Sequence, residues 1–329
     1  MLGDAMFPKS ITPPEIIRLV VFAAVAGSIL VAAGLWTGAW VMRKVRRRPE
    51  PKRSAAGAWT RRGVLTAAGT GAGCFLWGRF REPYWPQVTH TTLRTPKLRG
   101  ATRPIRLVQI SDMHSDPVVR LEGRLAGIIA GCQPDLIVFT GDCVNSPAGL
   151  GVFRRCLGEI SRVAPTYVCR GNWEVFFGDL DYFGTLDVVE LDGSWRSVSA
   201  AGARFTLAGQ AVGNGAPLIE ALAAAPPEDF TVFLHHYPKE IYELSATGRV
   251  DLHLAGHTHG GQVTVPFYGA LVTLSGHGKD LEWGLYRVGQ TTLYINRGIG
   301  MEGLMPRVRF GARPEISVFE LVGTAGCRA

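Results

Sequence analysis

The longest hydrophobic pattern in the chain is an uninterrupted run near its beginning. Residues 19–42 contain no charged side chain. A helix rises about 1.5 Å per residue, so a run of this length can cross a hydrocarbon layer of about 30 Å. The run ends abruptly at Arg43 and Lys44, as transmembrane helices do at the membrane surface. We therefore expect residues 1–42 to form an N-terminal transmembrane segment rather than a buried core helix.

A second uncharged run, residues 63–78, is shorter and rich in Ala, Gly and Thr. It follows Arg61 and Arg62, and paired arginines before a short apolar stretch resemble a twin-arginine export signal. Its length corresponds to only about 24 Å of helix, which is short for a membrane crossing. A second membrane anchor and a segment lying at the membrane interface are the alternatives. The signal would make the twin-arginine export machinery a partner.

The charges around these runs predict the topology. Between residues 43 and 62 there are nine Lys and Arg but only one acidic residue, Glu50. The positive-inside rule therefore places this basic loop in the cytoplasm. If residues 63–78 also cross, the rest of the chain lies on the outer, periplasmic or extracytoplasmic, face of the cell membrane.

The pattern changes after residue 78. Residues 79–103 contain scattered prolines and basic residues and are expected to form a linker. Short apolar strands are predicted at 105–110, 136–139 and 166–169, with helical spacing at 121–131 and 151–163 between them. Each strand ends in a polar residue beside a glycine or serine. This alternation predicts an α/β sheet with its chemistry at the carboxyl ends of the strands.

The second half of the domain contains more β-like runs parted by Gly, Pro and Asn. Strands are predicted at 205–207, 231–234, 252–254, 262–265, 285–288, 292–295 and 316–321, and helices at 217–225 and 239–246. We expect a mostly antiparallel region packed against the first sheet. The folded domain then covers residues 104–322, and residues 323–329 are a tail.

Charge and cysteine content exclude several classes of protein. The net charge of +8 suggests a nucleic-acid binder, but residues 1–106 hold 18 Lys and Arg against 4 Asp and Glu, and residues 107–329 hold 17 against 23. The folded part is acidic, so we expect no nucleic-acid partner. The six cysteines show no Cys-x-x-Cys spacing. Neither a zinc knuckle nor a disulfide scaffold is indicated.

Metal-competent side chains gather at the predicted strand ends. Asp112 and His114 are two residues apart, as are His257 and His259, and in extended chain this spacing puts both side chains of a pair on one face. Glycines flank the second pair and allow a close backbone approach. The complete set of candidate ligands is Asp112, His114, Asp142, Asn172, His236, His257 and His259.

These motifs occur in the order and spacing of a known family. Asp112-x-His114, Gly141-Asp142, Gly171-Asn172, His236-x-Pro238 and Gly256-His257-x-His259-Gly260-Gly261 resemble those of the calcineurin-like metallophosphoesterases. The ending Arg297-Gly298-Ile299-Gly300, Arg309-Phe310-Gly311 and Pro314-Glu315-Ile316 looks like that of the membrane-associated branch. That branch includes twin-arginine-exported enzymes and UDP-diacylglucosamine pyrophosphohydrolases of lipid A biosynthesis. The resemblance implies a two-sheet αββα sandwich.

The resemblance also implies a site with two divalent ions. Asp142 would bridge them, with Asp112, His114 and His259 on one ion and Asn172, His236 and His257 on the other. Mixed oxygen and imidazole ligands suit manganese, iron or zinc. The expected activity is hydrolysis of a phosphoester or pyrophosphate bond by a metal-bound hydroxide, on a phosphorylated small molecule or a lipid-linked substrate.

One position departs from the family pattern. The family commonly has His after the Gly-Asn pair, where it stabilises the transition state or protonates the leaving group, but this chain has Trp173. Indole cannot supply that proton usefully. The alternative function is therefore a catalytically weak, metal-containing module that binds a phospho-ligand. His235 is a further catalytic candidate or a packed neighbour of His236, and Arg170, His277 and Arg297 are candidates for substrate binding.

Overall fold

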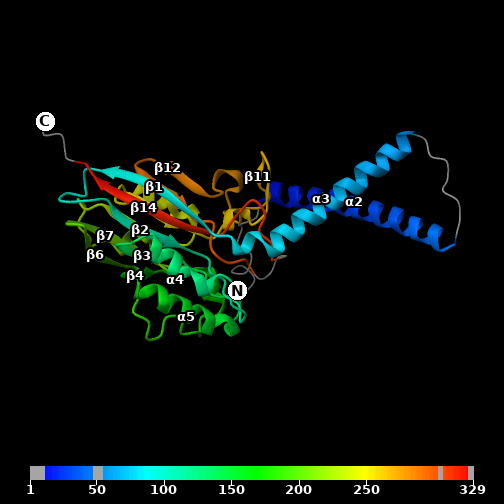
Figure 1. Ribbon diagram of the computed structural model, residues 1–329. Helices are drawn as coiled ribbons and strands as arrows, with labels where there is room; N and C mark the ends of the chain where they lie inside the picture. Colours follow the sequence, from blue (N-terminus) through cyan, green and yellow to red (C-terminus); the bar gives the residue numbers. More distant parts are fainter. Residues whose placement is uncertain (1–11, 47–54, 303–306, 325–329) are drawn as a thin grey trace.

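The structure is a computed structural model that describes residues 12–46, 55–302 and 307–324. Predictions for residues 1–11, 47–54 and 325–329 lie outside these residues. Two long helices extend from one end of a domain with two large β-sheets (Figure 1). The expected α/β fold with two sheets and an N-terminal apolar helix is confirmed.

The first helix, α2 (Pro13–Val45), contains the long uncharged run. Thr12 caps it, because the Glu15 carboxylate accepts hydrogen bonds from the Thr12 backbone N–H and hydroxyl, each at 2.8 Å. Pro13 fits the first turn, where no intrahelical N–H bond is needed. Among the described helices, α2 alone is long and apolar enough to cross a membrane.

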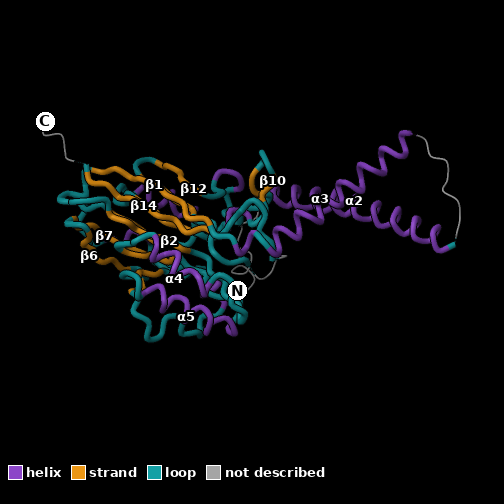
Figure 2. The backbone as a smooth tube through the Cα atoms, in the orientation of Figure 1, coloured by secondary structure: helices purple, strands orange, loops and turns teal. Residues whose placement is uncertain are grey.

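The second helix, α3 (Ala55–Phe80), contacts α2 and leads back to the domain (Figure 2). It includes the whole of the predicted segment 63–78, so the helix is ten residues longer than that uncharged run. Arg61 and Arg62 lie inside the helix rather than in a loop before it. Arginine has a high helix propensity, so α3 continues through both residues. It ends at Phe80, three residues before Pro83, which cannot continue a helix.

Both helices are attached to the domain at the ends nearest to it. Glu15 of α2 is fully buried and accepts hydrogen bonds from the Thr273 backbone N–H at 2.8 Å and hydroxyl at 2.9 Å. At the end of α3, the Gly78 carbonyl accepts the Arg309 backbone N–H at 2.9 Å. The first turn of α2 and the last turn of α3 are therefore part of the folded domain.

The first sheet has the strand order β1-β14-β2-β3-β4-β5. Its strands are parallel except for the antiparallel pair β14 and β2. The bounds are β1 (Gln87–Thr95), β2 (Ile105–Ile110), β3 (Leu136–Phe139), β4 (Thr166–Val168), β5 (Val189–Glu190) and β14 (Glu315–Gly323). Helices α4 (Glu122–Gly131) and α5 (Leu150–Ser161) connect its parallel strands.

The second sheet has the order β12-β13-β9-β8-β7-β6, and β10 and β11 form a separate hairpin. The bounds are β6 (Ser194–Ala200), β7 (Ala203–Gly209), β8 (Thr231–Leu234), β9 (Leu252–Ala255), β10 (Thr264–Val265), β11 (Gly269–Ala270), β12 (Gly284–Val288) and β13 (Thr291–Ile295). The remaining helices are α6 (Asn172–Phe176), α7 (Ile241–Ala246), η1 (Glu82–Tyr84), η2 (Pro147–Gly149), η3 (Leu218–Leu222), η4 (Pro238–Glu240), η5 (His259–Gly261) and η6 (Gly278–Asp280).

Two sequence predictions differ from this topology. The segment 79–103 is not a linker, because it contains η1 and the nine-residue strand β1, which pairs with β14. As an edge strand, β1 is only half-buried and its polar pattern therefore looks like that of a linker. The second sheet is also not mostly antiparallel: β13, β9, β8 and β7 are mutually parallel, and β14 leaves to join the first sheet.

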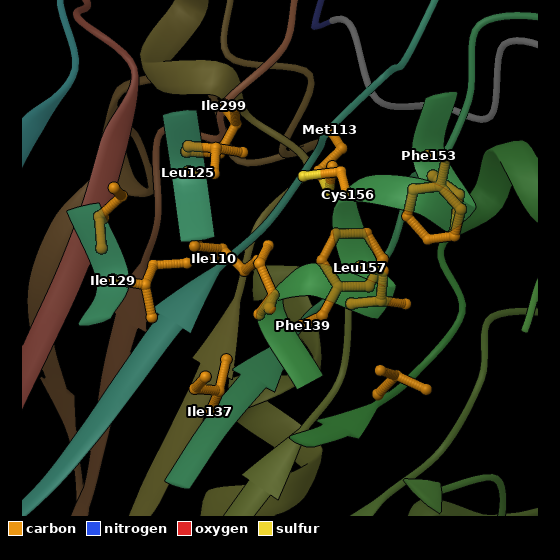
Figure 3. Packing of buried hydrophobic residues seen from close by; sticks show 14 of the residues in the cluster. Ile110, Met113, Leu125, Ile129, Ile137, Phe139, Phe153, Cys156, Leu157 and Ile299 are labelled. Atoms are coloured by element: carbon orange, nitrogen blue, oxygen red, sulfur yellow. The ribbon is translucent and has the colours of Figure 1, made fainter. Parts of the chain in front are cut away.

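The core lies in layers that follow the alternation of side chains along the central strands. Leu107 of β2 and Leu207 of β7 belong to the cluster between the two sheets. Ile110 of β2 points the other way, into the cluster that α4 and α5 cover (Figure 3). A third cluster packs η3 and α7 against the outer face of the second sheet. The central strands are thus buried on both faces, as their continuous hydrophobicity predicts.

Candidate metal centre

The candidate ligands follow strands of both sheets. Asp112 and His114 come after β2, Asp142 after β3, and His257 after β9. His236 follows β8, His259 opens η5, and Asn172 begins α6 just after β4. These strands are parallel within each sheet, so their carboxyl ends meet at one edge. We call this set of seven residues the metal edge.

The structure brings six of these residues into two overlapping groups. Asp112, His114, Asp142 and His259 form one, and Asp142, His236 and His257 form the other; within each group the ligand atoms lie within 4.8 Å of one another. The Asp142 Oδ2 atom lies 3.1 Å from His236 Nε2 and 3.4 Å from His114 Nε2. Asp142 is therefore common to both groups.

The orientation of the candidate ligands suits the binding of cations. His236 Nδ1 lies 2.7 Å from the Thr140 carbonyl, and His257 Nε2 lies 2.9 Å from the Leu274 carbonyl. A carbonyl only accepts, so each of these nitrogens carries a proton, and the opposite nitrogen is the one that would bind a metal after giving up any proton it holds. Within the described residues, the buried Asn172 Oδ1 atom has no hydrogen-bond partner. The residues present therefore fit bound divalent ions.

The backbone is strained at the same residues. Five of the ten described non-glycine residues with positive φ are candidate ligands: Asp112, His114, Asp142, His257 and His259. A left-handed conformation is uncommon for residues with a β-carbon and costs of order 1–3 kcal/mol at each such position. Its concentration at one edge indicates that the surrounding fold holds these side chains in a functional geometry.

Burial and charge shift the pKa values of the metal edge in opposite directions. Burial raises the pKa of Asp112, and the charge of Asp142 adds to this. Burial alone would also raise the pKa of Asp142, but the neighbouring His236 and His114 imidazoles hold it well below its usual value. Burial lowers the pKa of His257 to about 3 and places that of His259 well below its usual value. Ionised Asp142 and neutral His257 and His259 are the forms that bind metals.

Glu174 is a buried carboxylate beside the metal edge that the sequence analysis missed. Its buried carboxylate accepts the backbone N–H groups of Asp142 at 3.0 Å, Cys143 at 2.6 Å and Gly171 at 2.6 Å. It therefore ties the loop after β3 to the turn before Asn172. A glutamate three residues after the residue that caps a helix was the available signal.

Arg309 is a second residue whose place only the structure reveals. Its guanidinium is fully buried, donates to the Gly300 and Ala312 carbonyls, and lies 3.3 Å from His259 Nδ1. Burial lowers its pKa to about 9. Its own backbone N–H binds Gly78, so Arg309 connects the end of α3 to a candidate ligand.

Trp173 and His235 occupy different environments. The Trp173 backbone N–H donates to Asp142 Oδ1 at 3.0 Å, and its ring lies edge-on to His114 with ring centres 5.2 Å apart. Trp173 thus contacts the metal edge. The His235 Nδ1 atom accepts the Tyr237 backbone N–H at 3.1 Å, and burial lowers the pKa of His235 to about 3. His235 belongs to neither ligand group of the described residues.

The three substrate-binding candidates each contact a residue other than the candidate ligands. Arg170 pairs with Glu190 at 2.6 Å, and Arg297 pairs with the buried Glu315 at 2.9 Å. The His277 ring packs on Tyr242 with ring centres 5.0 Å apart. The structure does not bring these side chains into the two ligand groups, and a role in substrate binding stays a prediction.

A phosphoester hydrolase is the class of protein that this fold and site define. Two layered sheets with Asp, Asn and His at their carboxyl edge are suited to hold cations against a phosphoryl group. Comparison with known proteins agrees: the calcineurin-like phosphoesterase family matches residues 105–261. The chain belongs to the calcineurin-like metallophosphoesterases, and it is a metal-dependent phosphoester hydrolase.

Curated relatives extend the similarity beyond the matched region. The metallophosphoesterase YkuE of Bacillus subtilis is 30% identical over 80% of this chain and 93% of its own length. Phosphodiesterase YaeI of Escherichia coli is 27% identical over 79% of this chain and 95% of its own length. A transmembrane protein with a metallophosphoesterase domain from Bos taurus is 30% identical over 70% of this chain, which spans 56% of that protein.

Proposed function

We propose that this protein is a membrane-tethered phosphohydrolase that holds two divalent ions and cleaves a phosphodiester or pyrophosphate bond. The place of Asp142 in both ligand groups is the observation that carries this proposal. A lipid-linked diphosphate is the proposed substrate type. UDP-diacylglucosamine, of the lipid A pathway, is the member of this type that a domain on the cytoplasmic face would meet. Manganese, iron and zinc suit the mixed ligand set, and no nucleic acid is expected as a partner.

Two bound ions would supply charge stabilisation to the phosphoryl group and lower the pKa of an attacking water. The residues of the chain position this chemistry. Asp142 lies between the two ligand groups, and Glu174 and the Trp173 backbone hold its loop and its carboxylate. The Trp173 indole N–H can donate a hydrogen bond, but it is too weak an acid to protonate a departing alkoxide. The site therefore favours leaving groups of low pKa, such as the phosphate of a pyrophosphate.

The attachment of both helices supports a tethered domain on the outer face of the membrane. The start of α2 and the end of α3 are both bonded to the domain, through Glu15 and Gly78. The basic residues Arg43 and Lys44 lie at the other end of α2, and the positive-inside rule assigns that end to the cytoplasm. Export by the twin-arginine machinery, with Arg61 and Arg62 as its signal, is the proposed route.

A test of the activity uses the full chain in vesicles after removal of its metals and reloading with manganese, zinc or iron. We expect turnover of bis-p-nitrophenyl phosphate and of a lipid-linked diphosphate only in the reloaded protein. Binding of both compounds without turnover would favour the phospho-ligand binding module instead. A reporter fused after Ala329 tests the side of the membrane, because alkaline phosphatase is active outside and a fluorescent protein folds inside.

A further inference from the structure

We propose that the β10–β11 hairpin is a second membrane contact of this protein, in which Phe267 and Tyr268 lie in the headgroup region of the bilayer beside the first turns of α2. The contact rests on the proposed membrane crossing by α2. Its partner is the lipid surface, and its effect is to hold the metal edge at a set distance from that surface.

The hairpin exposes an aromatic side chain that the domain does not use. β10 and β11 pair through Thr264 with Ala270 and Val265 with Gly269, and Phe267 lies in the turn between them. Phe267 is fully exposed, at 112% of its reference area, and has a φ of 66°. A bulky residue in the left-handed region and in water is unfavourable on both counts. A lipid environment would remove the second cost.

The depth of the hairpin follows from its contact with α2. The Arg18 guanidinium lies 5.8 Å from the centre of the Tyr268 ring. Arg18 is the last charged residue before the uncharged run 19–42, so it marks the level at which the hydrocarbon layer begins. Tyr268 therefore lies at the same level, where tyrosine and tryptophan are enriched in membrane proteins. Figure 1 shows β11 beside the end of α2 that faces the domain.

The hairpin is held rigidly rather than left to move. The Lys279 ammonium donates to the Tyr268 carbonyl at 2.5 Å and lies 4.4 Å from the centre of its ring. Lys279 also pairs with Glu282, whose carboxylate accepts the Ala270 backbone N–H at 3.2 Å. Three residues after β11, Thr273 binds Glu15 of α2. These contacts fix the position of Phe267 relative to α2 without any contribution from lipid.

The same hairpin packs directly against the loop that carries two candidate ligands. A β-carbon on Gly261 would lie 2.4 Å from the Ala270 β-carbon, so the two segments are in close contact. At the other attachment point, the exposed aromatics Trp77 and Phe80 end α3. Exposed aromatic side chains therefore lie at both places where the helices leave the domain. This arrangement would fix the orientation of the metal edge over the bilayer.

The experiment measures the depth of Phe267 in the full chain. Phe267→Cys is made in a background in which Cys74, Cys132 and Cys327 are Ser, labelled with an environment-sensitive fluorophore, and reconstituted into phosphatidylcholine–phosphatidylglycerol vesicles. Quenching is measured with lipids that carry a nitroxide near the ester carbonyl. Gln290→Cys is the matched control, because Gln290 is an exposed turn residue of the β12–β13 hairpin before the amino end of β13. Val31→Cys reports the crossing by α2.

We expect the label at 267 to be quenched severalfold more strongly than the label at 290. Equal, weak quenching at 267 and 290 together with strong quenching at Val31 by lipids with a deep nitroxide would overturn the hairpin contact and leave the crossing intact. Weak quenching at all three positions would overturn the membrane tether itself. Self-quenching at 267 that persists in detergent would indicate a second copy of the chain as the partner and would also reject the lipid contact.

A second variant links the contact to activity without using the labelled protein. Phe267→Ser should slow turnover of a substrate embedded in the vesicle severalfold while leaving turnover of soluble bis-p-nitrophenyl phosphate unchanged. Equal rates on the embedded substrate would count against the orienting effect. Loss of both activities would point to a folding defect, which a melting curve and the depth measurement on the labelled chain distinguish from loss of the contact.

Discussion

The interior between the two sheets and the metal edge are formed by the same strands, yet they differ in polarity and in backbone conformation. Between the sheets, Leu107, Leu207 and Phe319 are fully buried, apolar and part of regular strands. Two or three residues beyond a strand end, Asp112 and Asp142 are equally buried but carry carboxyl groups and have positive φ. Burial therefore has two effects in this protein. It packs apolar side chains in the interior, and it holds polar side chains in a fixed geometry at the metal edge.

The stability gained in the interior between the sheets offsets the backbone strain at the metal edge. A strained ligand residue costs of order 1–3 kcal/mol, and burial of one large apolar side chain contributes about 1.5–3 kcal/mol. Each strained position is thus offset by roughly one core residue. This reasoning predicts that substitutions between the sheets change stability and leave the chemistry intact, whereas substitutions at the metal edge do the reverse.

The largest effect is expected for Asp142→Asn. The amide removes the charge between the two ligand groups, so turnover of bis-p-nitrophenyl phosphate should fall by more than about 100-fold, the upper range for losing a residue that only orients a ligand. Asp179→Asn, at an exposed loop position, is the matched control. Steady-state rates on the metal-loaded full chain check this, and a wild-type rate in Asp142→Asn would remove the basis of the two-metal proposal.

In the interior, Phe319→Ala should lower the free energy of unfolding by about 3–5 kcal/mol, because it leaves a void beside Tyr294 between the sheets. Phe319→Leu, which keeps most of the volume, should cost less. Urea titration of the full chain in detergent measures both. Turnover per folded molecule should stay near the wild-type value, and a loss as large as that of Asp142→Asn would contradict the separation of the two regions.

Removal of the metals should lower the free energy of unfolding, because only the metal edge loses interactions and the interior between the sheets is unchanged. At a free metal concentration of 100 times Kd, binding stabilises the folded state by about 2.7 kcal/mol. For a domain of this size, that corresponds to a rise in Tm of roughly 5–10 °C on reloading. Differential scanning calorimetry of stripped and reloaded protein checks the value. The rise should be smaller in Asp142→Asn, and an equal rise in both would place the metal elsewhere.

The smallest change concerns Trp173, which contacts the edge without belonging to either ligand group. Trp173→His should speed alkyl phosphodiester cleavage by up to about 100-fold, the lower range of general acid catalysis, and leave aryl substrates nearly unchanged. A plot of rate against leaving-group pKa should therefore become flatter. If Trp173 only packs against His114, the variant will slow all substrates to the same extent.

Local signals in the sequence were sufficient for the apolar helix, the central strands and the candidate ligands. An uncharged run, a continuously apolar strand or a histidine pair between glycines depends on neighbouring residues and can be read directly. These signals located α2, β2, β3 and all the members of the two ligand groups that the structure brings together.

Only the tertiary structure decided the rest, because the deciding partner lies far away in the chain. β1 is a strand since β14 pairs with it more than 200 residues later. Arg297 is directed to Glu315 and Arg170 to Glu190, so charge alone did not reveal whether they face a substrate. Glu174 matters through three backbone N–H groups that come together only when β3 and β4 pair. Local composition sets which residues can do the chemistry, and long-range packing sets which of them are free to do it.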